Sequence, residues 1–409
     1  MTDRVDDLLQ FIDSSPTPYH AVESAIARLE SAGFSRLEEG DAWSLEFGAR
    51  HYAVRAGGSL AAFEVGRRAP AEAGFRVVGA HTDSPNLRIK PHADVRAEGY
   101  HQLAVEPYGG VLLHTWLDRD LSLAGRVALR DGPNTTTQLV DFGRPLLRIP
   151  NLAIHLQREI HEEGLQLNKQ RHLAPLLGLD DDGSFLELLG EELGKTSGSV
   201  PAVDDILAFD LMVYDTQPST LSGAHDEFIH APRLDNLASS HAGLSALCDS
   251  AKAGEAAATR VVVLYDHEEV GSRSSQGAGG SFLGDLLGRL ARDPSLGGGD
   301  AEARARAIAR SWLISADMAH AIHPNYQDRH EPAHRPMIGR GPVIKTNQNQ
   351  AYATDAESAG YFAALCARAD VTPQQFVTRS DLGCGSTIGP ILSLIHISEP
   401  TRRRLESRF

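Results

Sequence analysis

The sequence has few cysteines, no long apolar segment and no excess of basic residues, and each absence excludes a class of protein. Its 409 residues include three cysteines with no CxxC spacing, so neither a disulfide scaffold nor a thiolate metal site is expected. No apolar stretch approaches the roughly 18 residues that a membrane span needs. The formal charge of −15 argues against nucleic acid or an anionic membrane as the main partner. The N-terminus, MTDRVDDLLQ, lacks a signal-peptide layout, so a cytoplasmic protein is expected.

The order of predicted elements indicates a layered α/β domain that is interrupted by a β-rich one. Phe75–Ala80 and Val261–Tyr265 are continuous apolar runs, which are typical of strands covered on both faces. Between them the texture changes to short β-like runs, such as Gly110–Leu113, that are broken by Gly, Asp and Pro. Later helices are expected over Leu237–Leu247, Phe282–Ala291 and Ala301–Ala309. The expected domains are a catalytic domain of residues 1–89 and 231–391, with residues 90–230 inserted between its two parts.

Metal-binding residue types follow three of the predicted strands and open one predicted helix. These positions are His81 and Asp83, Glu268 and Glu269, Asp317, and Asp235. Taken singly, Asp235 is better explained as a helix N-cap and the glutamate pair as surface charge. Strand ends of an α/β domain meet at one edge, however, and carboxylates rarely gather there without a cation to neutralise them. Together the residues favour a two-metal hydrolytic site.

The chemistry of such a site explains the residue types. Histidine and carboxylates hold Zn²⁺, and one carboxylate can bridge two ions roughly 3.5–4 Å apart. A water on such ions ionises near pH 7, so hydroxide is present at neutral pH. A carboxylate that is not itself a ligand must then accept the proton and return it to the leaving amine. The adjacent residues Glu268 and Glu269 can divide these two roles between them.

Six segments in order carry a family resemblance that runs almost end to end. They are GAHTDSPNLRIKP (79–91), PRLDNLAS (232–239), DHEEVGS (266–272), SADMAHAIHPNY (315–326), GPVIKTNQNQAYATD (341–355) and GCGSTIGPI (383–391). These segments resemble the M18 aminopeptidases, the aspartyl aminopeptidase family of dinuclear zinc exopeptidases. The resemblance implies an α/β catalytic domain with an inserted β-rich domain. It also implies a cytosolic homo-oligomer, usually a dodecamer, that removes N-terminal residues, acidic ones by preference.

The resemblance also assigns roles to residues that match the family motifs. It implies that His81 and Asp317 bind one zinc, Asp235 bridges both ions, Glu269 binds the second, and Glu268 is the general base. Asp83 is expected to support catalysis by orienting His81, as carboxylate–histidine–metal triads do. His320, Lys345 and Tyr352 match substrate-binding positions. His155 matches a family histidine near the active site; because it lies in the inserted domain, it is expected to serve a neighbouring subunit, as a ligand or as a substrate contact.

The sequence departs from the family after Ile391. The family continues to a late motif resembling MHS, whose histidine completes the second zinc site. Here the segment LSLIHISEPTR (392–402) instead matches one reading frame of a transposase adapter used in sequencing libraries, so residues 392–409 are expected to be a non-native tail. Its histidine, His396, is not assigned as a ligand. We therefore expect this chain to be impaired in activity.

Two other functions remain open from the sequence. One is a different dinuclear metal amidohydrolase, such as a deacylase, and the other is a non-catalytic subunit of an assembly. The ligand types accept several divalent ions, so they do not fix the native metal. The sequence also leaves open the physiological peptide and the oligomer's stoichiometry.

Overall fold

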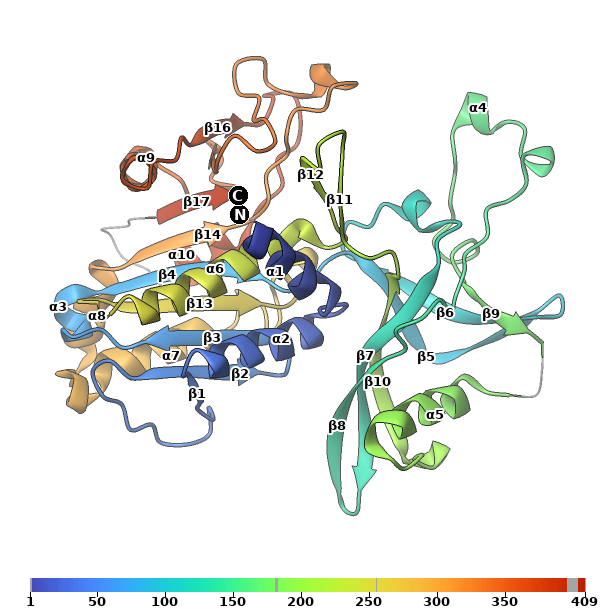
Figure 1. Cartoon of the computed structure of the whole chain (residues 1–409), viewed down its shortest axis with the longest axis horizontal. Coiled ribbons are helices and arrows are strands. Elements are labelled where there is room, and N and C mark those ends of the chain that lie inside the picture. Colours follow the sequence, from blue (N-terminus) through green and yellow to red (C-terminus); the bar gives the residue numbers. More distant parts are fainter. Residues whose placement is uncertain (1, 181–182, 255, 396–403, 409) are drawn as a thin grey trace. The chain divides into compact units, whose positions relative to one another are not determined.

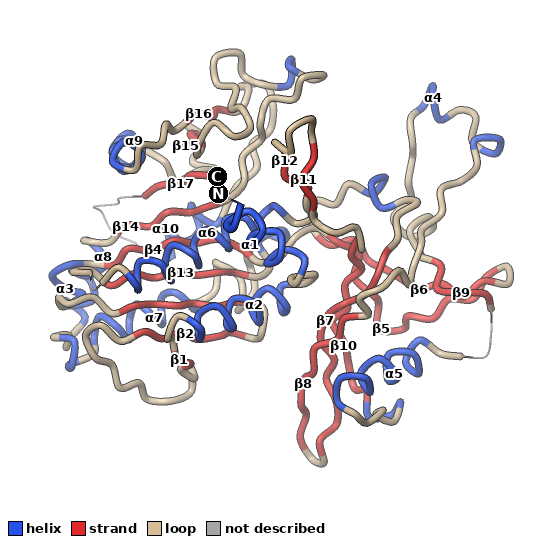
Figure 2. The backbone as a smooth tube through the Cα atoms, in the orientation of Figure 1, coloured by secondary structure: helices blue, strands red, loops and turns tan. Residues whose placement is uncertain are grey.

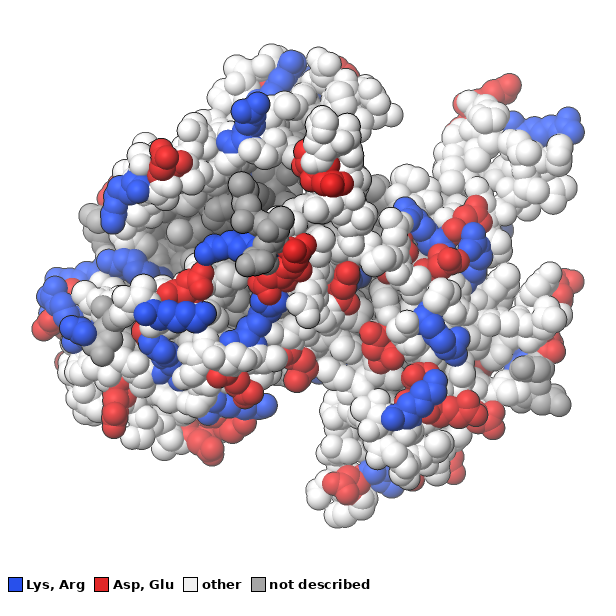
Figure 3. Space-filling model, viewed as in Figure 1, with Lys and Arg blue, Asp and Glu red and all other residues white. Residues whose placement is uncertain are grey.

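The computed structural model describes residues 2–180, 183–254, 256–395 and 404–408, which form two compact units (Figure 1). Unit 1 comprises Met1–Ile12, Ala21–Asp83 and Arg233–Phe409. Unit 2 comprises Asp13–His20 and Ser84–Pro232. None of the described helices is long and apolar enough to cross a membrane. On the face seen in Figure 3, acidic and basic side chains are interspersed.

Unit 1 is built on a nine-stranded sheet with the order β1-β2-β3-β13-β4-β14-β17-β15-β16. In that order the strands are Ser35–Arg36, Arg50–Arg55, Ser59–Glu64, Thr259–Tyr265, Phe75–His81, Trp312–Ala316, Arg404–Arg408, Val343–Thr346 and Gln374–Val377. The central strand β4 pairs in parallel with β13 on one side and β14 on the other. The two apolar runs that predicted buried strands are β4 and β13, so that prediction is confirmed.

Helices cover both faces of this sheet, which makes the unit a layered α/β structure as predicted (Figure 2). The helices are α1 (Thr2–Asp13), α2 (Pro18–Ser31), α3 (Pro70–Ala73), α6 (Leu234–Lys252), α7 (Phe282–Arg292), α8 (Ala301–Ala309), α9 (Ala356–Arg368) and α10 (Ile388–Ile395). Helix α6 packs on β4 and β13 through Gly243, whose missing Cβ would lie 3.4 Å from Val78. The neighbouring residue Val77 points to the opposite face, where it packs with the leucines of α7. Alternation along β4 thus places one helix layer on each side.

Unit 2 contains a six-stranded sheet with the order β8-β7-β10-β5-β6-β9 and a separate hairpin of β11 and β12. In chain order the strands are β5 (Asn86–Ala97), β6 (Tyr100–Tyr108), β7 (Leu121–Asp131), β8 (Asn134–Asp141), β9 (Leu176–Leu179), β10 (Ile206–Asp215), β11 (Thr220–Ser222) and β12 (Phe228–His230). Helix α5 (Phe185–Ser197) packs on this sheet through Phe185, Leu189 and Leu193, and α4 (Ile160–Glu163) is a single turn. The prediction of a strand over Gly110–Leu113 is wrong, because a loop there leads into a 3₁₀ turn at Leu113–Trp116.

Candidate metal and catalytic site

Three parallel strands bring the predicted ligands to one edge of the unit 1 sheet. In the register of the sheet, Tyr265 at the end of β13 lies opposite His81 at the end of β4. Ser315 of β14 lies opposite Gly79, two residues before His81. The strand ends are therefore level, and the residues that follow β13 and β14 emerge beside His81.

His81, Asp235 and Asp317 converge on one point. The Nε2 atom of His81 lies 3.4 Å from Oδ1 of Asp235 and 3.9 Å from Oδ1 of Asp317. One ligand atom from each residue lies within 4.8 Å of the other two. Tetrahedral zinc with ligands about 2.1 Å away would space such atoms by roughly 3.4 Å, so the donor set and its spacing fit this ion.

Asp83 holds this group together from behind. Its side chain is fully buried, and its Oδ1 atom lies 3.3 Å from Nδ1 of His81. The same carboxylate accepts the backbone N–H groups of Glu268 and Glu269, each at 3.1 Å. Because Nδ1 of His81 faces Asp83, Nε2 is the ring nitrogen that faces Asp235 and Asp317. Asp83 thus fixes the histidine through its backbone carbonyl, 3.0 Å from Nδ1, and through its carboxylate, which also holds the glutamate-bearing turn.

The backbone around Asp235 explains how this carboxylate reaches His81. Arg233 has a φ of 56°, the Asp235–Asn236 peptide bond is cis, and helical geometry is regular only beyond Asn236. The side chain of Asn236 donates a 2.8 Å hydrogen bond to the carbonyl of Ala316, directly before Asp317. Ser240 donates a 2.9 Å bond to the carbonyl of His81. Asp235 itself has extended backbone angles (φ −84°, ψ 105°), and its carboxylate is directed to His81.

Glu268 and Glu269 lie on a 3₁₀ turn, Glu268–Val270, that begins directly after His267, whose φ is 64°. Glu268 extends its Oε2 atom to 4.0 Å from Nε2 of His81. Burial, followed by repulsion from Asp317, Asp83 and Asp235, raises the pKa of Glu268 to about 7 against the opposing effect of His81. Burial, followed by repulsion from Asp83, Asp235 and Glu268, raises the pKa of Glu269 to about 8. Glu269 lies beside the group of three but is not one of the three residues whose ligand atoms converge.

The same carboxylates also raise the pKa of His81. Burial by itself would lower the pKa of the imidazole, but the carboxylates of Asp235, Asp317 and Asp83 outweigh it and hold the pKa well above its usual range. The arrangement therefore attracts positive charge to Nε2. A divalent cation supplies that charge with the ligand types that Zn²⁺ prefers.

The predicted substrate-binding residues of unit 1 form a second group around Phe376. Lys345 is 1% exposed on β15, opposite Phe376 of β16, and its ammonium lies 4.8 Å from the ring centre of Tyr352. Tyr352 packs in one cluster with Phe376. The ring of His320 lies 6.2 Å from that of Phe376 in an edge-to-face arrangement. The structure therefore brings His320, Lys345 and Tyr352 together.

His155 lies in unit 2, exposed on the 3₁₀ turn Ile154–Leu156, and is not among the residues that converge in unit 1. His396 lies outside the described residues. Asn236 and Ser240, which tie helix α6 to β14 and β4, were not predicted from the sequence. The sequence signal that could have identified them is that both are polar residues close to Asp235 in the chain.

Comparison with known proteins agrees with this geometry. The family model "Aminopeptidase I zinc metalloprotease (M18)" matches residues 11–395. A Streptomyces coelicolor protein described as a probable M18 family aminopeptidase 2 is 48% identical over 397 residues, which cover 96% of this chain and 88% of the relative.

Two solved structures share the fold. A complex of Ape4 and Nbr1 aligns with a TM-score of 0.93 and 37% identity, covering all of this chain and 80% of that one. The S. cerevisiae mApe1 dodecamer aligns with a TM-score of 0.83 and 29% identity, covering 98% of this chain and 89% of that one.

Proposed function

The chain belongs to the M18 family of zinc aminopeptidases, and we propose that it removes N-terminal acidic residues from peptides with two zinc ions and Glu268 as general base. The convergence of His81, Asp235 and Asp317 on one point is the observation that carries this proposal. The enzyme class follows from the family. The two ions, the residue roles and the acidic specificity are the proposed parts.

Each proposed ligand has a place in the structure. His81 and Asp317 are assigned to the first zinc, Asp235 bridges, and Glu269 is assigned to the second. Asp235 suits the bridging role because its side chain is half exposed whereas His81 and Asp317 are buried, so a second ion can approach it from the open side. When bound, the two ions supply Lewis acidity that brings the pKa of a coordinated water toward 7.

Glu268 is the side chain best placed to move the proton. Its carboxylate lies 4.0 Å from Nε2 of His81, so it borders the proposed ion site without being assigned as a ligand, and a carboxylate in that position can accept and release a proton. Asp83 holds the turn by accepting the Glu268 N–H, so the carboxylate keeps its position through both transfers. Glu268 then takes a proton from water and returns it to the leaving amine.

Substrate selection is assigned to the group around Phe376. Lys345 places a buried cation beside Tyr352, and a buried cation favours an acidic side chain over an apolar one because the charge pair forms away from water. His320 borders the same group through Phe376. The free amine of the substrate suits the carboxylates near the ions, which favours exopeptidase activity.

We further propose that the chain forms a cytoplasmic homo-oligomer. A dodecamer is the proposed assembly, because the S. cerevisiae relative forms one. In such an assembly the exposed His155 would act at a neighbouring subunit's site. This assignment is tested by His155→Ala in the assembled enzyme, where a changed KM or metal content would distinguish a substrate contact from a ligand.

The segment from Leu392 onward does not resemble the family's C-terminal motif with its zinc-binding histidine. We propose that this chain therefore holds its second ion more weakly than relatives that carry the motif. Replacing residues 392–409 with the corresponding segment of the S. coelicolor relative is expected to raise zinc content toward two ions per chain. The affinity for the second ion and the activity should rise by at least the roughly 10–100-fold range seen for outer-sphere ligand partners. An unchanged zinc content would contradict this proposal.

The test of function is a substrate panel assayed on both forms of the chain. N-terminal Asp, Glu and Leu chromogenic amides are compared with an N-acyl amino acid, which a deacylase would cleave. We expect cleavage of the Asp and Glu amides, and we expect Lys345→Met to lower their kcat/KM about tenfold or more relative to the Leu amide. Turnover of the N-acyl compound alone would replace the aminopeptidase proposal with the deacylase one.

A further inference from the structure

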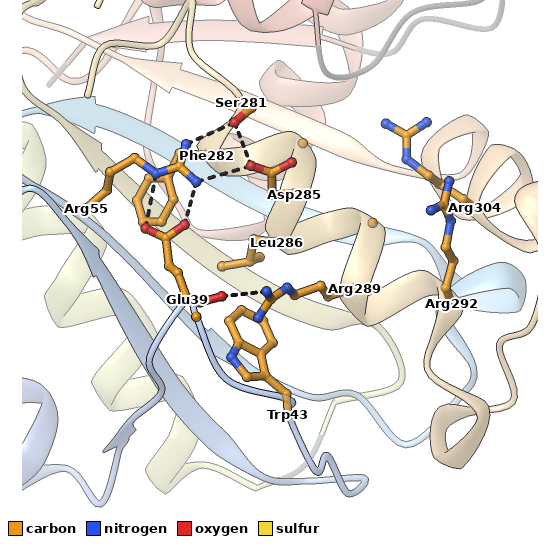
Figure 4. Close-up of a pocket in the computed structure, with 13 residues that line it drawn as sticks. Glu39, Trp43, Arg55, Ser281, Phe282, Asp285, Leu286, Arg289, Arg292 and Arg304 are labelled. Carbon is orange, nitrogen blue, oxygen red and sulfur yellow. Dashed lines mark hydrogen bonds and ion pairs between the residues drawn. The ribbon is translucent and has the colours of Figure 1, made fainter. Parts of the chain in front are cut away.

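A cavity of about 1010 Å³ lies on the outer face of helix α7, and none of the proposed metal ligands lines it (Figure 4). The inner face of α7 is apolar and packs into the core through residues such as Leu283 and Leu287. The outer face instead carries Gly284 and Gly288, one turn apart, so no side chain projects from the helix at these two positions. The loop with Glu39 and Trp43, the end of β2 and the start of α8 complete the lining.

One end of the cavity is occupied by a closed ion-pair network around Arg55 (Figure 4). The guanidinium of Arg55 pairs with Glu39 and lies 3.1 Å from Oδ2 of Asp285. It also donates a 3.1 Å hydrogen bond to Ser281 and lies over the ring of Phe282 at 4.8 Å. The two carboxylates of the lining are thus already engaged with one arginine.

Arg289 lies next along the helix and keeps its positive charge. Its guanidinium donates to the backbone carbonyls of Glu39 at 2.5 Å and Asp41 at 3.2 Å, and it lies 4.4 Å from the ring centre of Trp43. Neutral carbonyls orient a guanidinium but do not cancel its charge. Arg289 therefore adds a fixed cation to the cavity wall.

Arg292 and Arg304 line the opposite end, and within the described residues neither guanidinium has an ion pair. Nε of Arg304 lies 3.7 Å from the position that a Cβ on Gly288 would take, so this arginine packs over the outer face of α7. Arg292 follows Gly288 by one turn on that face, so both arginines border the same stretch of the cavity wall. Figure 4 shows both at one end of the cavity, away from the Arg55 network.

Helix electrostatics explains only one of these two arginines. Arg292 is in the last turn of α7, where a cation offsets the negative end of the helix dipole. Arg304 is in the amino-terminal half of α8, where the dipole disfavours a cation. In total, four arginines face two engaged carboxylates, so the cavity is positive in a chain whose net charge is −15.

We propose that this cavity is a binding site for a phosphate group, which Arg292 and Arg304 hold together at the end opposite the Arg55 network. Two guanidinium forks match the oxygens of a phosphate in number and direction, and Arg289 adds long-range attraction. The volume exceeds that of a free phosphate, so the site takes either inorganic phosphate or a small phosphate monoester.

The test is calorimetric titration of the 409-residue chain with inorganic phosphate and with adenosine monophosphate, in about 0.15 M NaCl to screen weak surface charge. We expect saturable binding that Arg304→Gln and Arg292→Gln each weaken about tenfold or more. Arg306→Gln is the matched control, because Arg306 is an exposed arginine on the same helix α8 but does not line the cavity. That variant should keep its Kd within about twofold. Tighter binding of the monophosphate identifies a monoester as the ligand, and equal binding identifies inorganic phosphate.

Four outcomes would overturn the proposal. These are no saturable binding of either compound, an equal loss in Arg306→Gln, loss of binding in His81→Ala, and equally tight binding of an N-acetylated hexaglutamate peptide. The His81→Ala arm separates the cavity from phosphate bound at the zinc ligands, and the blocked peptide separates phosphate from general acidic ligands. Thermal unfolding of each variant shows that it is folded before its titration is interpreted.

Discussion

The two charged regions of unit 1 gather opposite charges and differ in burial. At the sheet edge, carboxylates crowd a histidine that is 2% exposed, and the pKa values of Glu268 and Glu269 rise because burial and the neighbouring carboxylates disfavour their charged forms. On α7, by contrast, Arg289 and Arg292 are exposed to water, which already solvates their charge. A buried excess of charge is costly unless a counter-ion neutralises it, whereas water already stabilises an exposed excess of charge, so a counter-ion there adds little. The first region should therefore bind its ion far more tightly than the second.

The largest expected effect is loss of the ion from the buried region. His81→Ala removes the one nitrogen ligand of the proposed first zinc site, so the zinc affinity of that site and the aminopeptidase activity should fall by well over the roughly 100-fold that losing an outer partner costs. Metal analysis and the Asp-amide assay measure the two effects. His241→Ala is the matched control, because His241 also contacts a carboxylate, with Nε2 at 2.6 Å from Asp7, but belongs to no ligand group. Equal zinc loss in His81→Ala and His241→Ala would contradict the assignment of His81 as a zinc ligand.

The next largest effect is a difference between the Glu268 and Glu269 variants in zinc content and kcat. Glu268→Gln should retain zinc but lower kcat by about 10²–10⁴-fold, because the amide cannot accept the proton. Glu269→Gln should instead lose zinc from the second site, because it removes a ligand oxygen. Zinc content and kcat measured on the same preparations decide the assignment. Retained zinc in Glu269→Gln would contradict the ligand role of Glu269. Loss of zinc in Glu268→Gln would contradict the assignment of Glu268 as a base that is not a ligand.

The smallest effect is on stability after chelation. The folded chain holds a proton on Glu268 up to a pKa of about 7, whereas an ordinary glutamate releases it near 4.5. Stability from this proton is present at low pH and is lost as pH rises through that window, and the raised pKa of His81 acts in the same direction at higher pH. Between pH 5 and pH 8 the free energy of unfolding should fall by at least roughly 2 kcal/mol, because Glu269, whose pKa is about 8, adds to the effect of Glu268.

Urea unfolding of chelated protein at several pH values measures this slope. Glu268→Gln should reduce the slope and leave the part due to Glu269 and His81. Added zinc should remove the slope, and Arg304→Gln should leave it unchanged because that arginine lies outside the carboxylate group. A chelated protein that becomes more stable as pH rises from 5 to 8 would contradict the charge imbalance inferred for the buried region.

The sequence predicts those parts of the fold in which a short run of neighbouring residues already shows whether the segment is buried. Phe75–Ala80 and Val261–Tyr265 are apolar throughout because both faces of β4 and β13 are covered. Strand β8, NTTTQLVD, was not predicted, because its residues are polar and mostly exposed, and pairing with β7 is what orders them. Gly110–Leu113 misled for the opposite reason, since its apolar residues find no partner strand among the described residues.

The same limit applies to the two charged regions. The convergence at the sheet edge was predictable because strand ends in a layered domain meet, which brings His81 and Asp317 together whatever lies between them. The reversal at Arg233 that directs Asp235 there depends on backbone geometry that no residue type announces. The arginine cavity was not predicted, because Arg292 and Arg304 belong to separate helices and only their packing over Gly288 makes them neighbours.

The chain passes from unit 1 to unit 2 directly after Asp83 and returns at Arg233, two residues before Asp235. Every proposed metal ligand therefore stays on the unit 1 side of both crossings, and His155 alone among the candidate residues lies on the other. A change of length or sequence within residues 84–232 can therefore leave the proposed ligand positions of unit 1 in place.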